Sequence, residues 1–284
     1  MGLADNKLAA ISIKKAGKRG LCKNIYFPKI SRTAFLRLTV GRKHFTMISV
    51  KKEWMEWHKM NYQEIITFIM EMIGTVAFAA SGAMVGAKRK MDIFGICVLG
   101  VITAVGGGIT RDVILGITPP SVFQNPIYAL VATVVSCLVF MVLYLNQELL
   151  EGKSRVTYDR IMIMMDAVGL AIFTVVGVNI GIRKGYLENA FLLVFLGTIT
   201  GVGGGLLRDM MAGVPPYIFV RHIYACASIV GALTCVWIHR IFGEVEAMVV
   251  SSIVVLIIRY LAAHYRLNLP RLELKEHRDH GDGQ

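Results

Sequence analysis

Two copies of a seven-residue motif place glycines beside a pair of opposite charges. Residues 106–112 read Gly-Gly-Gly-Ile-Thr-Arg-Asp, and residues 203–209 read Gly-Gly-Gly-Leu-Leu-Arg-Asp. Each copy follows an apolar run, where an arginine must be paired or hydrated and where charges mark ion or substrate pathways. We predict that the motif residues line such a pathway: Gly106, Gly107, Gly108, Arg111, Asp112, Gly203, Gly204, Gly205, Arg208 and Asp209. In the alternative interpretation, the arginines only hydrogen-bond carbonyl groups between two packed halves.

The glycine triplets predict an interruption in each helix that contains them. A glycine in a helix interior costs about 1 kcal/mol relative to alanine, so three in succession predict a kink or break. Carbonyl and amide groups freed at membrane depth are tolerated only inside protein or beside water. Asp112 and Asp209 are candidate partners of Arg111 and Arg208. Because adjacent residues on a helix point apart, pairing between the two halves is the alternative.

The composition indicates a membrane protein. The chain has 284 residues, of which 55% are hydrophobic, and its mean hydropathy is +0.58. Its apolar runs are much longer than the roughly 4–8 residues of a buried strand, which argues against a large soluble α/β enzyme. They predict an all-α polytopic membrane protein with seven transmembrane helices. The expected spans cover residues 65–87, 93–115, 127–145, 161–182, 190–211, 223–238 and 245–263.

The internal repeat extends beyond the glycine motif. Glu71 corresponds to Asp166 and Tyr128 to Tyr224, and a Pro-Pro pair follows each motif. Three spans per copy is an odd number, so the second copy enters the membrane from the opposite side, as in transporters and related channels. We therefore divide the chain into an extension (1–60), two three-helix repeats (61–150 and 151–240), a seventh helix (241–266) and a polar tail (267–284).

Basic residues predict the orientation in the membrane. The loops that contain residues 88–90 and 153–160 are rich in Lys and Arg. Because positively charged loops stay in the cytoplasm, we expect the amino end outside and the carboxyl end inside.

The amino-terminal extension argues the other way. Residues 1–60 hold 14 of the 31 Lys and Arg residues but three of the 19 acids. The segment is a basic arm that binds anionic lipids, a transit peptide, or sequence that precedes a true start at Met47, Met55 or Met60. We expect residues 1–46 to be dispensable.

Other chemistry is not supported by the residue pattern. His222, His239 and His264 lack metal-ligand spacing, and the glycine motifs lack the Gly-Lys-Ser/Thr ending of a phosphate-binding loop. We therefore expect no enzymatic activity, no metal, no cofactor and no nucleic-acid partner. Glu71 and Asp166 remain functional candidates as intramembrane acids, although each lies near a span end and could face water.

The doubled Gly-Gly-Gly-x-x-Arg-Asp motif, in two three-helix repeats followed by a seventh helix, resembles the prokaryotic trimeric intracellular cation (TRIC) channel family. The same domain is called the glycine transporter domain in related bacterial proteins. The resemblance covers about residues 62–270, including Arg259-Tyr-Leu-Ala-Ala near the carboxyl end.

This resemblance implies a homotrimer in the inner membrane, with one pore in each protomer. It also implies permeation of monovalent cations, with potassium favoured, and kinked second and fifth helices at Gly106–Gly108 and Gly203–Gly205. The domain name keeps open a secondary transporter of glycine or a similar small amino acid. A structural scaffold would not need paired intramembrane Arg and Asp residues.

Overall fold

Seven long helices build the part of the chain that the structure describes. The computed structural model describes residues 62–146, 148, 154–220 and 223–265. The long helices are α3 (Tyr62–Lys88), α4 (Ile93–Ile114), α6 (Ile127–Leu145), α7 (Ser154–Arg183), α8 (Ala190–Met211), α10 (Ile223–Phe242) and α11 (Glu244–His264), and α5 (Ser121–Gln124) and α9 (Tyr217–Val220) are single turns. Each long helix has the length and composition to cross a membrane, which confirms the seven predicted spans and the all-α class.

The observed helix ends lie within about four residues of the predicted spans except at the start of α7. This helix begins at Ser154 instead of residue 161. Its added turns are held because the hydroxyl of Tyr158 donates a hydrogen bond to the carbonyl of Met84 at 2.5 Å. The predictions for the extension, the tail and His222 lie outside the described residues.

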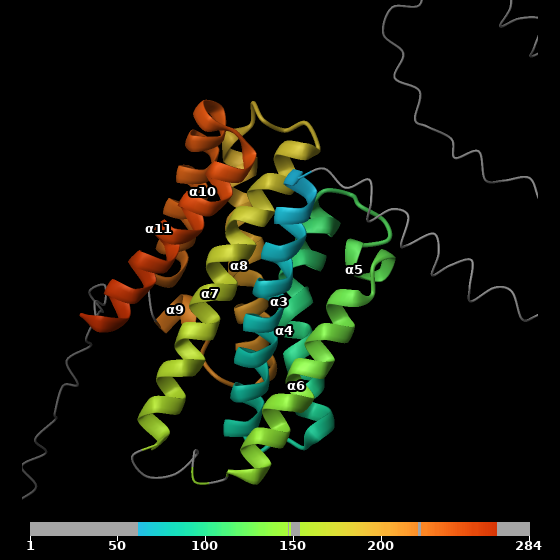
Figure 1. Ribbon diagram of the computed structural model, residues 1–284, viewed down its shortest axis with the longest axis vertical. Helices are drawn as coiled ribbons and strands as arrows, with labels where there is room; N and C mark the ends of the chain where they lie inside the picture. The colour runs from blue at the N-terminus through green and yellow to red at the C-terminus, as the bar shows by residue number, and fades with distance from the viewer. Residues whose placement is uncertain (1–61, 147, 149–153, 221–222, 266–284) are drawn as a thin grey trace, which may run out of the picture. The chain divides into compact units, whose positions relative to one another are not determined.

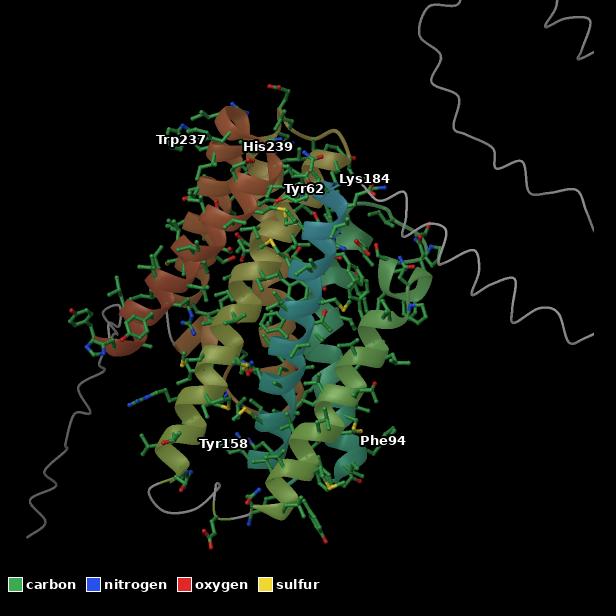
Figure 2. The ribbon with its side chains drawn as sticks, in the orientation of Figure 1. Tyr62, Phe94, Tyr158, Lys184, Trp237 and His239 are labelled. Atoms are coloured by element: carbon green, nitrogen blue, oxygen red, sulfur yellow. The ribbon has the colours of Figure 1, made fainter. Side chains whose placement is uncertain are left out.

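The two repeats run in opposite directions. Figure 2 shows Tyr62, at the start of α3, at the same end of the bundle as Lys184, which follows α7. Tyr158, near the start of α7, lies at the other end with Phe94 of α4. The first helices of the two repeats therefore begin at opposite ends, as the predicted inverted repeat requires. In Figure 1, α11 lies beside α10 on one flank of the bundle, and α6 lies on the other.

Small residues allow the helices of each repeat to approach closely. A Cβ atom on Gly82 of α3 would lie 2.9 Å from the Cα of Gly100 in α4. In the second repeat, a Cβ atom on Gly177 would lie 2.8 Å from the carbonyl oxygen of Leu196. Both glycines belong to Gly-xxx-Gly pairs, and their role here is close helix packing.

Each motif helix ends in the same way, directly after its Arg-Asp pair. Gly116 and Gly213 adopt φ of 66° and 63°, left-handed values that favour glycine. Beyond them, the amide of Ile117 donates to the carbonyl of Asp112 at 2.8 Å, and the amide of Val214 to that of Asp209 at 3.0 Å. This pattern closes a helix and satisfies its last carbonyl groups. The Arg-Asp pairs are thereby fixed in the final turns of α4 and α8.

The helix directions give a test of the predicted orientation. The segment after α3 is basic and exposed at Lys88, Arg89 and Lys90, whereas Lys184 lies at the opposite end of the bundle. Reporter fusions after Arg89 should be active in the cytoplasm, and fusions after Lys184 should be active outside it. The reverse pattern would show that the amino end of α3 lies in the cytoplasm.

Candidate functional site

The glycine triplets do not break their helices. Helix α4 continues through Gly106–Gly108, and α8 continues through Gly203–Gly205. The predicted break is therefore wrong, whereas the kink stays a prediction. The glycines allow α4 and α8 to cross where the two repeats meet. A Cβ atom on Gly107 would lie 2.1 Å from the carbonyl oxygen of Thr200, and one on Gly204 would lie 2.2 Å from that of Thr103. Only glycine lets the backbones of α4 and α8 meet this closely, because both neighbouring atoms are rigid backbone.

The third glycine of the motif has different surroundings in the two repeats. Gly205 packs against the second repeat, since a Cβ atom there would lie 2.5 Å from the hydroxyl of Tyr224. At the equivalent Gly108, the nearest atom is Nη2 of Arg111 at 3.8 Å, and Gly108 lines a cavity. The same sequence motif thus faces open space in one repeat and a packed core in the other.

The first-repeat site consists of Arg111, Asp112, Glu71 and Tyr128. Arg111 donates from Nε and Nη2 to Oδ1 of Asp112, at 2.9 and 2.7 Å. The other carboxylate oxygen of Asp112 accepts the amide of Ser121, the first residue of α5, at 2.7 Å. Across the cavity, the hydroxyl of Tyr128 donates to the carboxylate of Glu71.

The first-repeat site opens on a cavity of about 230 Å³. Its polar wall is formed by Glu71, Thr75, Arg111, Asp112, Ser121, Asn125 and Tyr128. Apolar side chains, including those of Val105 and Phe173, form the rest of the wall. At their formal charges, one arginine faces two carboxylates, so the cavity has an excess of negative charge that suits a cation.

The second-repeat site has the same parts but is fully buried. Arg208 donates from Nη1 to Oδ1 of Asp166 at 2.6 Å and to the hydroxyl of Ser81 at 2.7 Å, and from Nε to Oδ1 of Asp209 at 2.9 Å. Oδ2 of Asp209 accepts the amide of Tyr217 at 2.9 Å, which matches the Asp112–Ser121 contact of the first repeat. Arg208 and Asp166 are each about 1% exposed, and neither lines the cavity.

The seventh helix adds a residue to the second-repeat site. Arg259 of α11 lies with Nη2 3.8 Å from Oδ2 of Asp166 and with its guanidinium carbon 4.7 Å from the centre of the Tyr224 ring. Two arginines therefore meet two carboxylates, and the formal charges balance. The side chains of Arg259 and Ser81 were not among the predicted site residues. Arg259 could have been predicted from the sequence, because it is an arginine within an apolar span. Ser81 could not, because a serine in such a span carries no comparable signal.

The pairing predicted for the motif arginines is wrong in part. Each arginine pairs with the aspartate next to it, because an arginine side chain is long enough to bend back to the neighbouring carboxylate. The additional acidic partner of Arg208 is Asp166 of α7, within the same repeat, and its partner in the opposite repeat is the hydroxyl of Ser81. Each Arg-Asp pair thus lies with the intramembrane acid or tyrosine of its own repeat. Among the described residues, no ion pair joins the motif of one repeat to the motif of the other.

An aromatic pair lies where the repeats meet. Phe78 and Phe173 occupy equivalent positions in the two repeats, and their rings stack at a centroid distance of 5.3 Å. Phe78 is 1% exposed and lies close to Gly204 of the helix crossing, whereas Phe173 borders the cavity. The stacked rings thus connect the glycine crossing with the wall of the cavity.

Relatives of the chain are membrane proteins. The model of the glycine transporter family matches residues 68–144 and 163–240, which correspond to the two repeats. The chain is 36% identical over 216 residues to UPF0126 inner membrane protein YadS of Escherichia coli K12, which covers 75% of this chain and 99% of that protein. It is 32% identical over 209 residues to a UPF0126 membrane protein of Deinococcus radiodurans, with 73% and 92% covered.

Solved structures of channels share the fold. A TRIC cation channel is 34% identical, with a TM-score of 0.63 over 73% of this chain and 97% of that chain. The TRIC trimeric intracellular cation channel orthologue from Rhodobacter sphaeroides is 30% identical, with a TM-score of 0.64 over 71% and 99%. These relatives are membrane proteins and channels rather than enzymes, in agreement with the prediction. The chain therefore belongs to the glycine transporter family of multi-pass membrane proteins, is related to the UPF0126 membrane proteins, and has the fold of the TRIC cation channels.

Proposed function

We propose that the chain is a channel for monovalent cations, with potassium favoured and one pathway in each protomer of a homotrimer. The main support for this proposal is the charge of the first-repeat cavity, which is lined by the carboxylates of Glu71 and Asp112 but by one guanidinium, that of Arg111. A low-dielectric cleft with an excess of one charge concentrates ions of the opposite sign. The fold of cation channels at 28–34% identity, and the trimeric orthologue among them, support the proposal.

The proposed pathway joins the two motif sites through the centre of the protomer. It enters at the cavity beside Gly108 and Arg111, passes the Phe78–Phe173 pair and continues to the buried site around Arg208. Conduction requires a continuous wet path. The arrangement described here therefore corresponds to a closed channel, with the second-repeat half shut.

A flux assay tests the proposal directly. Purified full-length protein in liposomes should carry potassium down its gradient, while labelled glycine in the same vesicles should not accumulate. Potassium flux without glycine uptake is the expected result. Glycine uptake without potassium flux would overturn the channel assignment in favour of a transporter.

We expect the Glu71→Gln variant to conduct potassium about fivefold less well than the unmodified protein. A unit charge about 4 Å from a cation contributes about 1 kcal/mol even in bulk water, which corresponds to that factor. Single-channel conductance at low ionic strength measures the effect, since added salt screens it. Asp159→Asn is the matched control, because Asp159 is an exposed acid that pairs with Lys88 outside the cavity. Equal conductance in both variants would show that Glu71 does not face the ion pathway.

The alternative function is secondary transport of glycine or a similar small amino acid. One observation favours it: the cavity is lined by both a guanidinium, at Arg111, and a second carboxylate besides Asp112, at Glu71. These groups match the carboxylate and the ammonium of a zwitterionic amino acid. A site closed on one side is also what alternating access requires.

The Arg111→Gln variant separates the two functions. In a channel, loss of this positive charge should raise the cation occupancy of the cavity and increase potassium conductance. In a transporter, loss of the carboxylate partner should weaken substrate binding, and removal of a charge-assisted hydrogen bond costs about 1.5–3 kcal/mol, or a Km increase of about ten- to a hundredfold. Potassium flux and glycine uptake measured on the same preparation decide between them. A variant unchanged in both assays would assign Arg111 to structure alone.

A further inference from the structure

The second-repeat site contains one residue, Arg259, that comes from outside both repeats. Both motif sites contain an Arg-Asp pair, an intramembrane acid and a tyrosine. Arg259 is present only at the second-repeat site and comes from α11, which belongs to neither repeat. We infer that Arg259 is the positioning residue that keeps the second-repeat half of the path closed. This inference rests on the proposed conduction path through both sites.

The contacts of Arg259 suit such a role. Its guanidinium lies within ion-pair distance of the Asp166 oxygen that Arg208 does not bind, and over the face of Tyr224. Tyr224 in turn contacts Gly205, so α11 holds the aromatic side chain that fills the space next to the motif. At the first-repeat site, the equivalent space beside Gly108 belongs to the cavity.

The charge balance explains why this contact closes the site. With Arg259, two arginines neutralise Asp166 and Asp209, and the buried cluster has no net formal charge. Without it, one arginine would face two carboxylates, as at the first-repeat site. An uncompensated charge at membrane depth must be hydrated. Removing Arg259 should therefore give the second-repeat site the charge of the first, and should draw water into it.

Accessibility of Ser81 provides a test that does not depend on ion flux. Ser81 is fully buried and accepts a hydrogen bond from Arg208. In the full chain with its own cysteines replaced, Ser81→Cys should react slowly with a charged methanethiosulfonate reagent. Adding Arg259→Met should speed the reaction at least about tenfold, because the uncompensated negative charge that remains favours the hydrated, open arrangement. Arg259→Lys should restore slow labelling, and Tyr260→Phe, an exposed neighbour on α11, should leave it unchanged.

Flux measured on the same variants separates this inference from the proposed function. Faster labelling together with raised basal potassium flux in Arg259→Met supports both. Faster labelling without potassium flux would support the closing role of Arg259 and contradict the cation path. Slow labelling in an Arg259→Met protein that elutes and melts like its parent would overturn the inference. If Arg259→Met fails to fold, the Arg259→Gln variant gives the same comparison, and equally slow labelling there overturns it too.

Discussion

Gly107→Ala and Gly204→Ala should each lower the stability of the protein strongly, whereas Gly108→Ala should not. The first two place a methyl group 2.1 and 2.2 Å from backbone carbonyl oxygens of the opposite repeat. Overpacking of this kind typically costs about 1–3 kcal/mol and more where the neighbour cannot move. At Gly108 the new methyl group meets only the end of the Arg111 side chain at 3.8 Å. There the better helix propensity of alanine, worth up to about 1 kcal/mol, should dominate.

Thermal unfolding in detergent measures this contrast. The three substitutions are chemically identical, and two of them, at Gly107 and Gly108, are adjacent on α4. Helix propensity alone would move their melting temperatures in the same direction. A lower melting temperature for Gly107→Ala with an unchanged or raised one for Gly108→Ala is the expected result. Similar behaviour of all three would show that α4 and α8 do not cross by backbone contact.

The Arg208→Gln variant is expected to be the most destabilised of the charge substitutions. It leaves Asp166 and Asp209 buried with Arg259 as the remaining cation near them. Breaking a buried ion pair by removing one partner costs about 3–5 kcal/mol. The equivalent Arg111→Gln should cost less, because Asp112 keeps its bond to the amide of Ser121 and the adjoining cavity can admit water.

A double variant identifies the cause of that loss. Arg208→Gln combined with Asp166→Asn removes one charge of each sign and keeps the cluster formally neutral. If the uncompensated charge is responsible, the double variant should be more stable than either single variant, as a double-mutant cycle would show. Additive losses in unfolding experiments would instead assign the effect to the lost side-chain packing.

The sequence predicted the architecture well because its signals are local or repeated. Apolar runs defined seven spans, and the matched positions of Glu71 with Asp166 and of Tyr128 with Tyr224 defined the inverted repeat. These same four residues then complete the two motif sites. Their roles remain predictions, as does the assignment of the motif residues to a pathway.

The role of the glycines was harder to predict. Glycine propensity describes an isolated helix, and in that setting three glycines favour a break. Tertiary contact reverses the outcome, because the backbone of α8 occupies the space that a side chain on Gly107 would need. The contribution of Arg259 depends on where α11 packs against the second repeat, and no periodicity or repeat signal specifies that position.

The crossing of α4 and α8 also constrains how the chain assembles in the membrane. The glycine face of α4 is complementary to α8, which the ribosome delivers only after two further long helices, α6 and α7. Until α8 inserts, the first repeat has an incomplete interface with exposed helical backbone at Gly107. We expect the first repeat to stay incompletely packed in the membrane until the second repeat has inserted. If the gene is split between the two repeats, each fragment should therefore be stable only when both fragments are produced together.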